Sequence, residues 1–217
     1  RAAYGGRSTN FHEGVDRMSD AATMTTGHVG GAGLDTDTLM MMLDALGEFV
    51  AHSLPDKLML ELDHEDKCPE DIVRAMSDPN QLGVQLIFVP EAYGGMDGGA
   101  YDSYRVCEVM ARHDIGLATA VFATFLGSDP ILVGATEQQK LKWLGAIAEE
   151  GLVFAYGATE PEAGSDLGSM KTTAARIENE DGEITGYRIN GQKQWISNGS
   201  IADATTILAK TPEGPSW

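Results

Sequence analysis

The chain has 217 residues, enough for one full hydrophobic core or two small ones. Acidic residues number 33 against 15 basic ones, so the formal net charge is −18 at pH 7. This balance argues against nucleic acid or an anionic membrane as a partner, and any anion site must be built locally. Two cysteines, Cys68 and Cys107, lie in unrelated contexts, which favours reduced thiols over a disulfide or metal site. No apolar stretch is expected to be long enough to span a bilayer.

Residues 1–34 are rich in glycine, serine and threonine, and we expect them to form a flexible N-terminal extension. The glycine run at residues 27–33 imitates a dinucleotide-binding motif, but it follows no predicted strand. A helical domain is then predicted over residues 35–150, and a β domain over residues 151–217.

The first predicted helix carries Leu39, Leu43, Leu46 and Val50 at helical spacing, after N-cap candidates at residues 35–37. The charged run at residues 61–66 indicates a solvated connection, because its charges are adjacent in sequence rather than gathered on one face. A short helix is predicted to start at Pro69. Residues 82–89 are apolar, and their propensity alone would permit a strand.

Two further helices are predicted over residues 100–113 and 114–126, and the second should be buried because it is apolar nearly all round. Thr136 and Gln139 fit a capping box at the start of another helix, which should turn four apolar side chains inward: Leu141, Leu144, Ile147 and Ala148. Gly151 ends this helix and no linker follows, so the helical and strand parts should pack tightly.

A buried strand is predicted at residues 152–156, and it stops at Thr159-Glu160-Pro161 because proline cannot continue a sheet ladder. The following Ala163-Gly164-Ser165-Asp166 presents a bare backbone whose amides could point at an anion. No lysine accompanies these residues, which excludes a Walker-type nucleotide loop.

Further short strands are predicted at residues 171–178, 187–190, 192–197 and 204–209, too few to close a barrel without edges. Asn190-Gly191 and Asn198-Gly199 are hairpin signals that bound the third of these strands. By the two-residue period, Trp195 and Ser197 should share one of its faces while Ile196 points the other way.

Two motifs carry a family resemblance: Tyr-x-x-Thr-Glu-Pro-x-Ala-Gly-Ser-Asp from Tyr156, and Asn-Gly-x-Lys-x-Trp-Ile-Ser-Asn-Gly from Asn190. Together with residues 89–95 and 134–140, they resemble the acyl-CoA dehydrogenase family of flavoenzymes. The resemblance implies an α+β architecture, with an N-terminal all-α domain followed by a β-barrel-like domain that is incomplete here. It also implies that residues 82–89 form a helix end and loop, and that the helix at 114–126 borders an acyl pocket.

The resemblance further implies an oxidoreductase of fatty acid metabolism that uses FAD for α,β-dehydrogenation of an acyl-CoA thioester. Implied partners are the acyl-CoA, an electron-transfer flavoprotein or similar acceptor, and further copies of the chain in a homo-oligomer. The implied location is the cytoplasm, or the mitochondrial matrix in a eukaryote. The family's proton-abstracting glutamate and C-terminal helical bundle are expected beyond Trp217, so no catalytic residue is assigned here and Glu160 is interpreted as a loop-structuring residue.

The cofactor-binding residues implied by the resemblance come from both motifs. Tyr156, Ala158 and Thr159 correspond to positions on the flavin ring, and Gly164 and Ser165 to positions on the phosphate linker. Ser165 also corresponds to a position that touches the CoA chain. The far wall corresponds to Trp195, Ile196 and Ser197, with the Ser197 hydroxyl near the hydride-accepting nitrogen.

Several alternatives stay open from the sequence. Trp195 could be an ordinary core residue and the glycine loop an ordinary turn. Glu162 stands where the family often has glycine, and its carboxylate would oppose a phosphate unless it points away. The chain could also be a non-catalytic binding or scaffold relative, one chain of a split enzyme, or an acyl-CoA oxidase.

Overall fold

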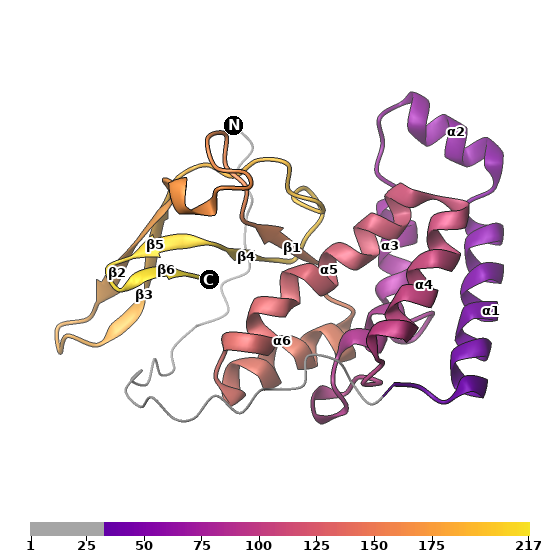
Figure 1. Cartoon of the computed structure of the whole chain (residues 1–217), viewed down its shortest axis with the longest axis horizontal. Helices are drawn as coiled ribbons and strands as arrows, with labels where there is room; N and C mark the ends of the chain where they lie inside the picture. Colours follow the sequence, from indigo (N-terminus) through magenta and orange to yellow (C-terminus); the bar gives the residue numbers. More distant parts are fainter. Residues whose placement is uncertain (1–32) are drawn as a thin grey trace.

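The structure, a computed structural model, describes residues 33–217. Most of the predicted extension at residues 1–34 lies outside this range. The described chain is α+β: helices come first in sequence and occupy one side of the molecule, and the strands follow on the other side (Figure 1). The predicted fold class is therefore confirmed.

The first helices are α1 (Thr36–Ser53), α2 (Asp56–His64) and α3 (Glu70–Ser77). Helix α1 begins as predicted, because the Asp35 carboxylate accepts hydrogen bonds from the Thr38 and Asp37 amides. Residues 61–66 are largely exposed, as predicted, but the prediction of a connection was wrong for the first four of them, since α2 continues to His64. The apolar residues 82–89 form a short 3₁₀-helix, η1 (Val84–Phe88), and no strand; η2 (Glu91–Tyr93) follows.

Three longer helices complete the helical part: α4 (Ala100–His113), α5 (Ile115–Gly134) and α6 (Glu137–Glu150). The capping box at Thr136 and Gln139 is formed as predicted. Leu144, Ile147 and Ala148 of α6 are buried, whereas Leu141 is 60% exposed and does not face inward as expected.

Helix α5 crosses the middle of the molecule and packs against α4, α6 and the first strand (Figure 1). The prediction of a buried helix over residues 114–126 holds only in part, because Ile115 and Leu126 within this range are exposed. The prediction that no apolar stretch is long enough to span a bilayer also needs correction, because α5 has 20 residues and could cross a membrane by length and composition. Protein elements cover part of it instead, and core helices of this length pass the same test.

The strands form two sheets. Strand β1 (Phe154–Gly157) pairs in parallel with β4 (Ala204–Ile207). The second sheet has the order β3-β2-β5-β6, from β2 (Thr173–Glu178), β3 (Ile184–Asn190), β5 (Ala209–Thr211) and β6 (Gly214–Ser216). Strands β3 and β6 are its edges, so the described strands form open sheets.

The predicted strand at residues 192–197 is absent from the described structure, and this segment is an irregular loop. Asn190-Gly191 does not turn a hairpin: Asn190 ends β3, and the β2–β3 hairpin turns at residues 179–183. Asn198-Gly199 does lie in a turn. The predicted strand at residues 204–209 is divided between β4 and β5 at Leu208. Hairpin propensity failed here because the flanking segments pair with other elements.

The helical and strand parts pack directly against each other, as predicted. A Cβ atom at Gly127 of α5 would lie 2.9 Å from the Ala155 carbonyl oxygen and from Phe154 Cβ, so only glycine permits this approach. The Phe154 amide donates to Thr124 Oγ1 of α5 (3.1 Å). The Thr206 hydroxyl donates to the Gly127 carbonyl oxygen (2.8 Å). Strand β1 is thereby fixed in position along α5.

Candidate functional site

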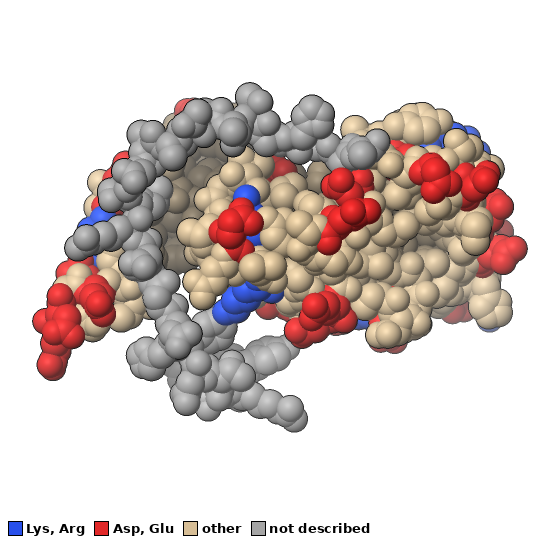
Figure 2. Space-filling view, turned by 90° about the horizontal axis from the view of Figure 1, so that it is seen from below, with Lys and Arg blue, Asp and Glu red and all other residues tan. Residues whose placement is uncertain are grey.

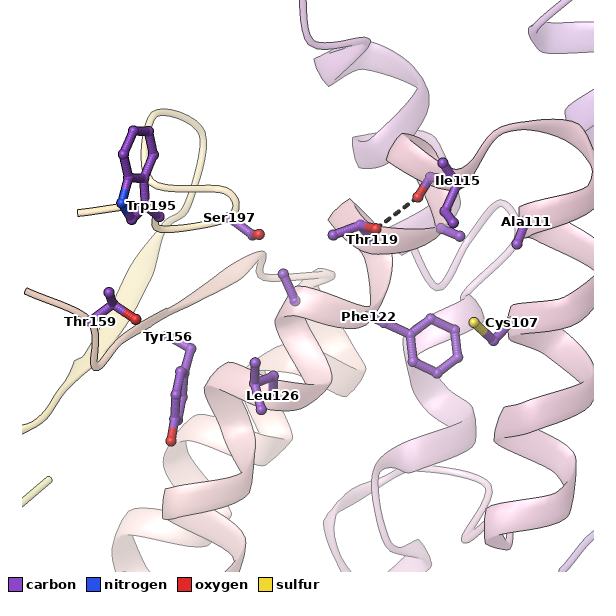
Figure 3. A pocket seen from close by; sticks show the side chains of 12 residues that line it. Cys107, Ala111, Ile115, Thr119, Phe122, Leu126, Tyr156, Thr159, Trp195 and Ser197 are labelled. Carbon is purple, nitrogen blue, oxygen red and sulfur yellow. Dashed lines mark hydrogen bonds between the residues drawn. The ribbon is translucent and has the colours of Figure 1, made fainter. Parts of the chain in front are cut away.

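A cavity of about 570 Å³ lies between α4 and α5 on one side, and strand β1 with the loops at residues 158–166 and 191–199 on the other. Figure 3 shows the side chains that line it. The lining residues are Cys107, Ala111, Ile115, Ala118, Thr119, Phe122, Ala123, Leu126, Tyr156, Thr159, Trp195 and Ser197. The cavity therefore joins segments far apart in the sequence.

The helical wall of the cavity is mainly apolar. Helix α5 contributes Phe122 and Leu126, and α4 contributes Cys107, which lies beside Phe122 (Figure 3). Thr119 adds little polarity, because its hydroxyl donates to the Ile115 carbonyl oxygen within the same helix (2.7 Å). This wall is suited to an apolar ligand group.

The opposite wall brings together four of the residues assigned to the cofactor from sequence. Tyr156 comes from β1, Thr159 from the loop that follows, and Trp195 and Ser197 from the loop at residues 191–199. Figure 3 shows Ser197 pointing toward α5, with Trp195 on the same loop. Trp195 is 83% exposed, which excludes the alternative that it is an ordinary core residue.

The other four assigned residues are not part of the cavity lining. Ala158 is buried and Ile196 is half-buried, while Gly164 and Ser165 are exposed on the loop that follows β1. A Cβ atom at Gly164 would meet no atom of the described residues within 4 Å. Because neither Gly164 nor Ser165 bonds to another described residue, their amides remain free to bind a ligand.

Glu160 organises the loop between β1 and Ser165. Its backbone forms a tight bridge with Ala163, with N···O distances of 2.9 and 3.2 Å. The buried carboxylate accepts hydrogen bonds from the amides of Lys171 (2.6 Å) and Thr172 (3.1 Å) and from Lys193 Nζ (2.8 Å). Burial raises the pKa of this carboxyl, but hydrogen bonds from Lys193, Thr172 and Lys171 outweigh it and lower the pKa to about 2. Glu160 is thus ionised and structural, as interpreted from sequence.

The charges near the loop are locally compensated. Glu162 forms an exposed ion pair with Lys171, which partly neutralises the carboxylate that the sequence comparison singled out. Burial, reinforced by Asp129, raises the pKa of the Tyr156 phenol, so this ring stays uncharged at neutral pH. Figure 2 shows acidic side chains spread over one face of the molecule, with a group at the end where the β2–β3 hairpin lies. An anionic ligand would therefore depend on the free amides rather than on the overall field.

Comparison with known proteins identifies this arrangement. The acyl-CoA dehydrogenase N-terminal domain matches residues 22–151, and the middle domain of the same family matches residues 155–216. The chain belongs to the acyl-CoA dehydrogenase family. The probable medium-chain specific acyl-CoA dehydrogenase 2 of Caenorhabditis briggsae is 32% identical over 155 residues, which are 71% of this chain and 36% of that protein.

Solved structures of acyl-CoA dehydrogenases share the fold. Butyryl-CoA dehydrogenase from Megasphaera elsdenii superposes with a TM-score of 0.69 at 32% identity, over 82% of this chain and 45% of that one. An acyl-CoA dehydrogenase complexed with FAD from Bacillus anthracis gives 0.67 at 30% identity, over 83% and 30%. This acyl-CoA dehydrogenase-family chain thus spans less than half the length of these relatives.

Sequence reasoning missed the lining residues of α4, above all Cys107 and Ala111. Their side chains follow the ordinary helical pattern, and no local motif marks them. The contribution of α5 was expected, because the family resemblance implied that the helix at residues 114–126 borders an acyl pocket.

Proposed function

We propose that this chain forms the flavin-binding wall and one side of the acyl pocket of an FAD-dependent acyl-CoA dehydrogenase. One observation carries the proposal: the cavity places Tyr156, Thr159, Trp195 and Ser197 opposite the apolar wall of α4 and α5. Aromatic and hydroxyl-bearing residues on one side and an apolar surface on the other suit a planar cofactor stacked beside an acyl chain.

The residues present fit FAD. Trp195 and Tyr156 offer aromatic surface for a planar ring, and the hydroxyls of Thr159 and Ser197 offer hydrogen bonds at its edge. The open space around Gly164 and the free amides of Gly164 and Ser165 suit a diphosphate linker. Glu162 opposes this less than its position suggests, because Lys171 pairs with it.

When bound, FAD supplies the acceptor for a hydride leaving the β carbon of the thioester. The chain's own residues orient the reactants: the Ser197 hydroxyl donates at the ring edge, and the apolar helical wall excludes water from the acyl chain. Proton removal from the α carbon needs a base such as a carboxylate. Among the described residues, those that line the cavity include no carboxylate, and we assign this wall a binding role.

Ser165 is proposed to contact the CoA chain as well as the phosphate linker, because it is exposed next to Gly164 and bonds to none of the residues that the structure describes. An electron-transfer flavoprotein is the proposed acceptor, and the assembly is proposed to contain several copies of the chain. Comparing reduction of an electron-transfer flavoprotein with peroxide release under air would separate a dehydrogenase from an oxidase.

The decisive experiment is titration of the purified protein with FAD, followed by absorbance in the flavin band and by flavin fluorescence. We expect saturable binding of FAD, seen as a change in both signals. Ser165→Glu should abolish binding, because it sets a carboxylate against the phosphates. Absence of FAD binding to the wild-type protein would contradict the proposal. Full FAD content in Ser165→Glu would remove Ser165 from the proposed site.

A further inference from the structure

The loop at residues 191–199 has little main-chain support, although it carries Trp195 and Ser197. No strand ladder among residues 33–217 includes it. Within the described chain, its backbone bonds to the loop at residues 158–166 through the Gln194 amide, which donates to the Thr159 carbonyl oxygen (3.0 Å). Something other than sheet pairing must hold this wall of the cavity in place.

The first side-chain tether is Lys193. Its ammonium donates to Glu160 Oε1 (2.8 Å) and to the Ala158 carbonyl oxygen (2.9 Å). The pair is buried, with exposed side-chain fractions of 11% for Lys193 and 4% for Glu160. Removing one partner of such a pair leaves an uncompensated charge, so the contact binds the loop firmly to the residues after β1.

The second side-chain tether is Asn198. Its amide nitrogen donates to the Ala120 carbonyl oxygen of α5 (2.7 Å) and to the Phe154 carbonyl oxygen of β1 (3.2 Å). Asn198 therefore connects the loop to the helix and to the strand that form the other sides of the cavity. The two tethers enclose Trp195 and Ser197 in the sequence.

The backbone between the tethers is strained. Trp195 has φ of +58° and Asn198 has φ of +61°, both in the left-handed region. Asparagine tolerates this region, whereas a bulky residue such as tryptophan rarely adopts it. A strained residue of this kind persists only when its surroundings hold it, at a cost of about 1–3 kcal/mol. The two tethers on either side of Trp195, together with the Gln194 hydrogen bonds to the Thr159 and Glu160 carbonyl oxygens (3.0 and 3.4 Å), are the contacts that can do so.

We propose that Lys193 and Asn198 are positioning residues that hold Trp195 in its left-handed conformation and thereby present Trp195 and Ser197 to the cavity. Their role in flavin binding rests on the function proposed above, whereas their hold on the loop does not. Lys193 and Asn198 would support the binding of a planar aromatic ligand indirectly, because neither side chain lines the cavity itself.

Asn198→Gly tests the second tether without disturbing the backbone, since glycine also adopts a positive φ. We expect FAD affinity to fall at least tenfold and the flavin absorption bands to shift, while the unfolding temperature of the FAD-free protein changes little. Gln192→Ala is the matched control, because Gln192 lies exposed in the same loop and bonds to no described residue.

The Lys193→Met/Glu160→Gln double variant tests the first tether without leaving a buried carboxylate unpaired. It should weaken FAD binding to a similar extent, and the single variant Lys193→Arg, which keeps the positive charge, should retain more affinity than Lys193→Met. Lys210→Met is the control for loss of an exposed lysine, with no expected change. If the double variant fails to fold, Asn198→Gly still decides the question.

Hydrogen exchange in the FAD-free protein gives a readout independent of the cofactor. Exchange of the Gln194 amide, which is bonded to Thr159, should accelerate at least tenfold in both tether variants and stay unchanged in both controls. Unchanged exchange would overturn the proposal. If the wild type binds FAD and the tether variants bind it equally well, Lys193 and Asn198 have no role in cofactor binding. If the wild type does not bind FAD, the result counts against the proposed function alone.

Discussion

Strand β1 and the loop at residues 191–199 supply the two halves of one wall, yet they are held by different forces. Strand β1 is almost wholly buried, paired with β4 and pressed against α5 at Gly127. The loop has an exposed tryptophan, left-handed backbone at Trp195 and Asn198, and the tethers from Lys193 and Asn198. Stability should therefore depend on β1, and ligand affinity on the loop.

The sharpest test of this division is Phe154→Ala in β1. Phe154 is 2% exposed and meets Trp143 edge-on, with ring centroids 6.1 Å apart. We expect a loss of about 3–5 kcal/mol in the free energy of unfolding, measured by urea denaturation. Tyr187→Ala, at a partly exposed strand position, should cost far less. Equal losses of unfolding free energy in Phe154→Ala and Tyr187→Ala would show that stability does not depend specially on β1.

A smaller loss is expected for Gly127→Ala, where the new Cβ would press on the Ala155 carbonyl. The destabilisation should be about 1–3 kcal/mol, as for overpacking elsewhere. Gly145→Ala in α6 is the matched control, because no atom of residues 33–217 lies within 4 Å of its added Cβ. That change should stabilise the protein by up to about 1 kcal/mol through helix propensity. A neutral Gly127→Ala would mean that α5 and β1 can separate without cost.

The link between β1 and the loop at residues 191–199 should weaken in acid, because it depends on ionised Glu160. Its folded pKa of about 2 lies below the ordinary value of 4.5, so its contribution to stability is complete above pH 4.5. That contribution should disappear as the pH falls from 4.5 toward 2. Thermal unfolding across this window should show a shallower decline in Glu160→Gln, with Glu162→Gln as the exposed control. An unchanged profile in Glu160→Gln would place the titrating group elsewhere.

The smallest effect on stability is expected for Trp195→Ala in the loop. Trp195 is 83% exposed, so the free energy of unfolding should change by less than about 0.5 kcal/mol. Affinity for FAD should nevertheless fall tenfold or more, because aromatic contact with the ring is lost. Calorimetric unfolding and FAD titration on the same sample separate the two quantities. A large loss of stability would show that the ring packs within the fold.

The sequence by itself determined the features that depend on neighbouring residues. Helix periodicity located α1 and α4, the Thr136–Gln139 pair located the start of α6, and a run of apolar residues located β1. Family motifs also named Tyr156, Thr159, Trp195 and Ser197, which the fold brings to one cavity. Each of these signals is local, because capping and periodic burial act over a few residues.

Tertiary structure alone decided the loop at residues 191–199 and the helical wall opposite it. Alternating residues and two Asn-Gly pairs predicted a strand there, but Lys193 reaches Glu160 and Asn198 reaches α5, and those distant contacts select an irregular backbone. Cys107 and Ala111 enter the cavity only because α4 packs beside α5. Contacts between residues far apart in sequence override local propensity, since burial and charge pairing outweigh differences of about 1 kcal/mol in strand preference.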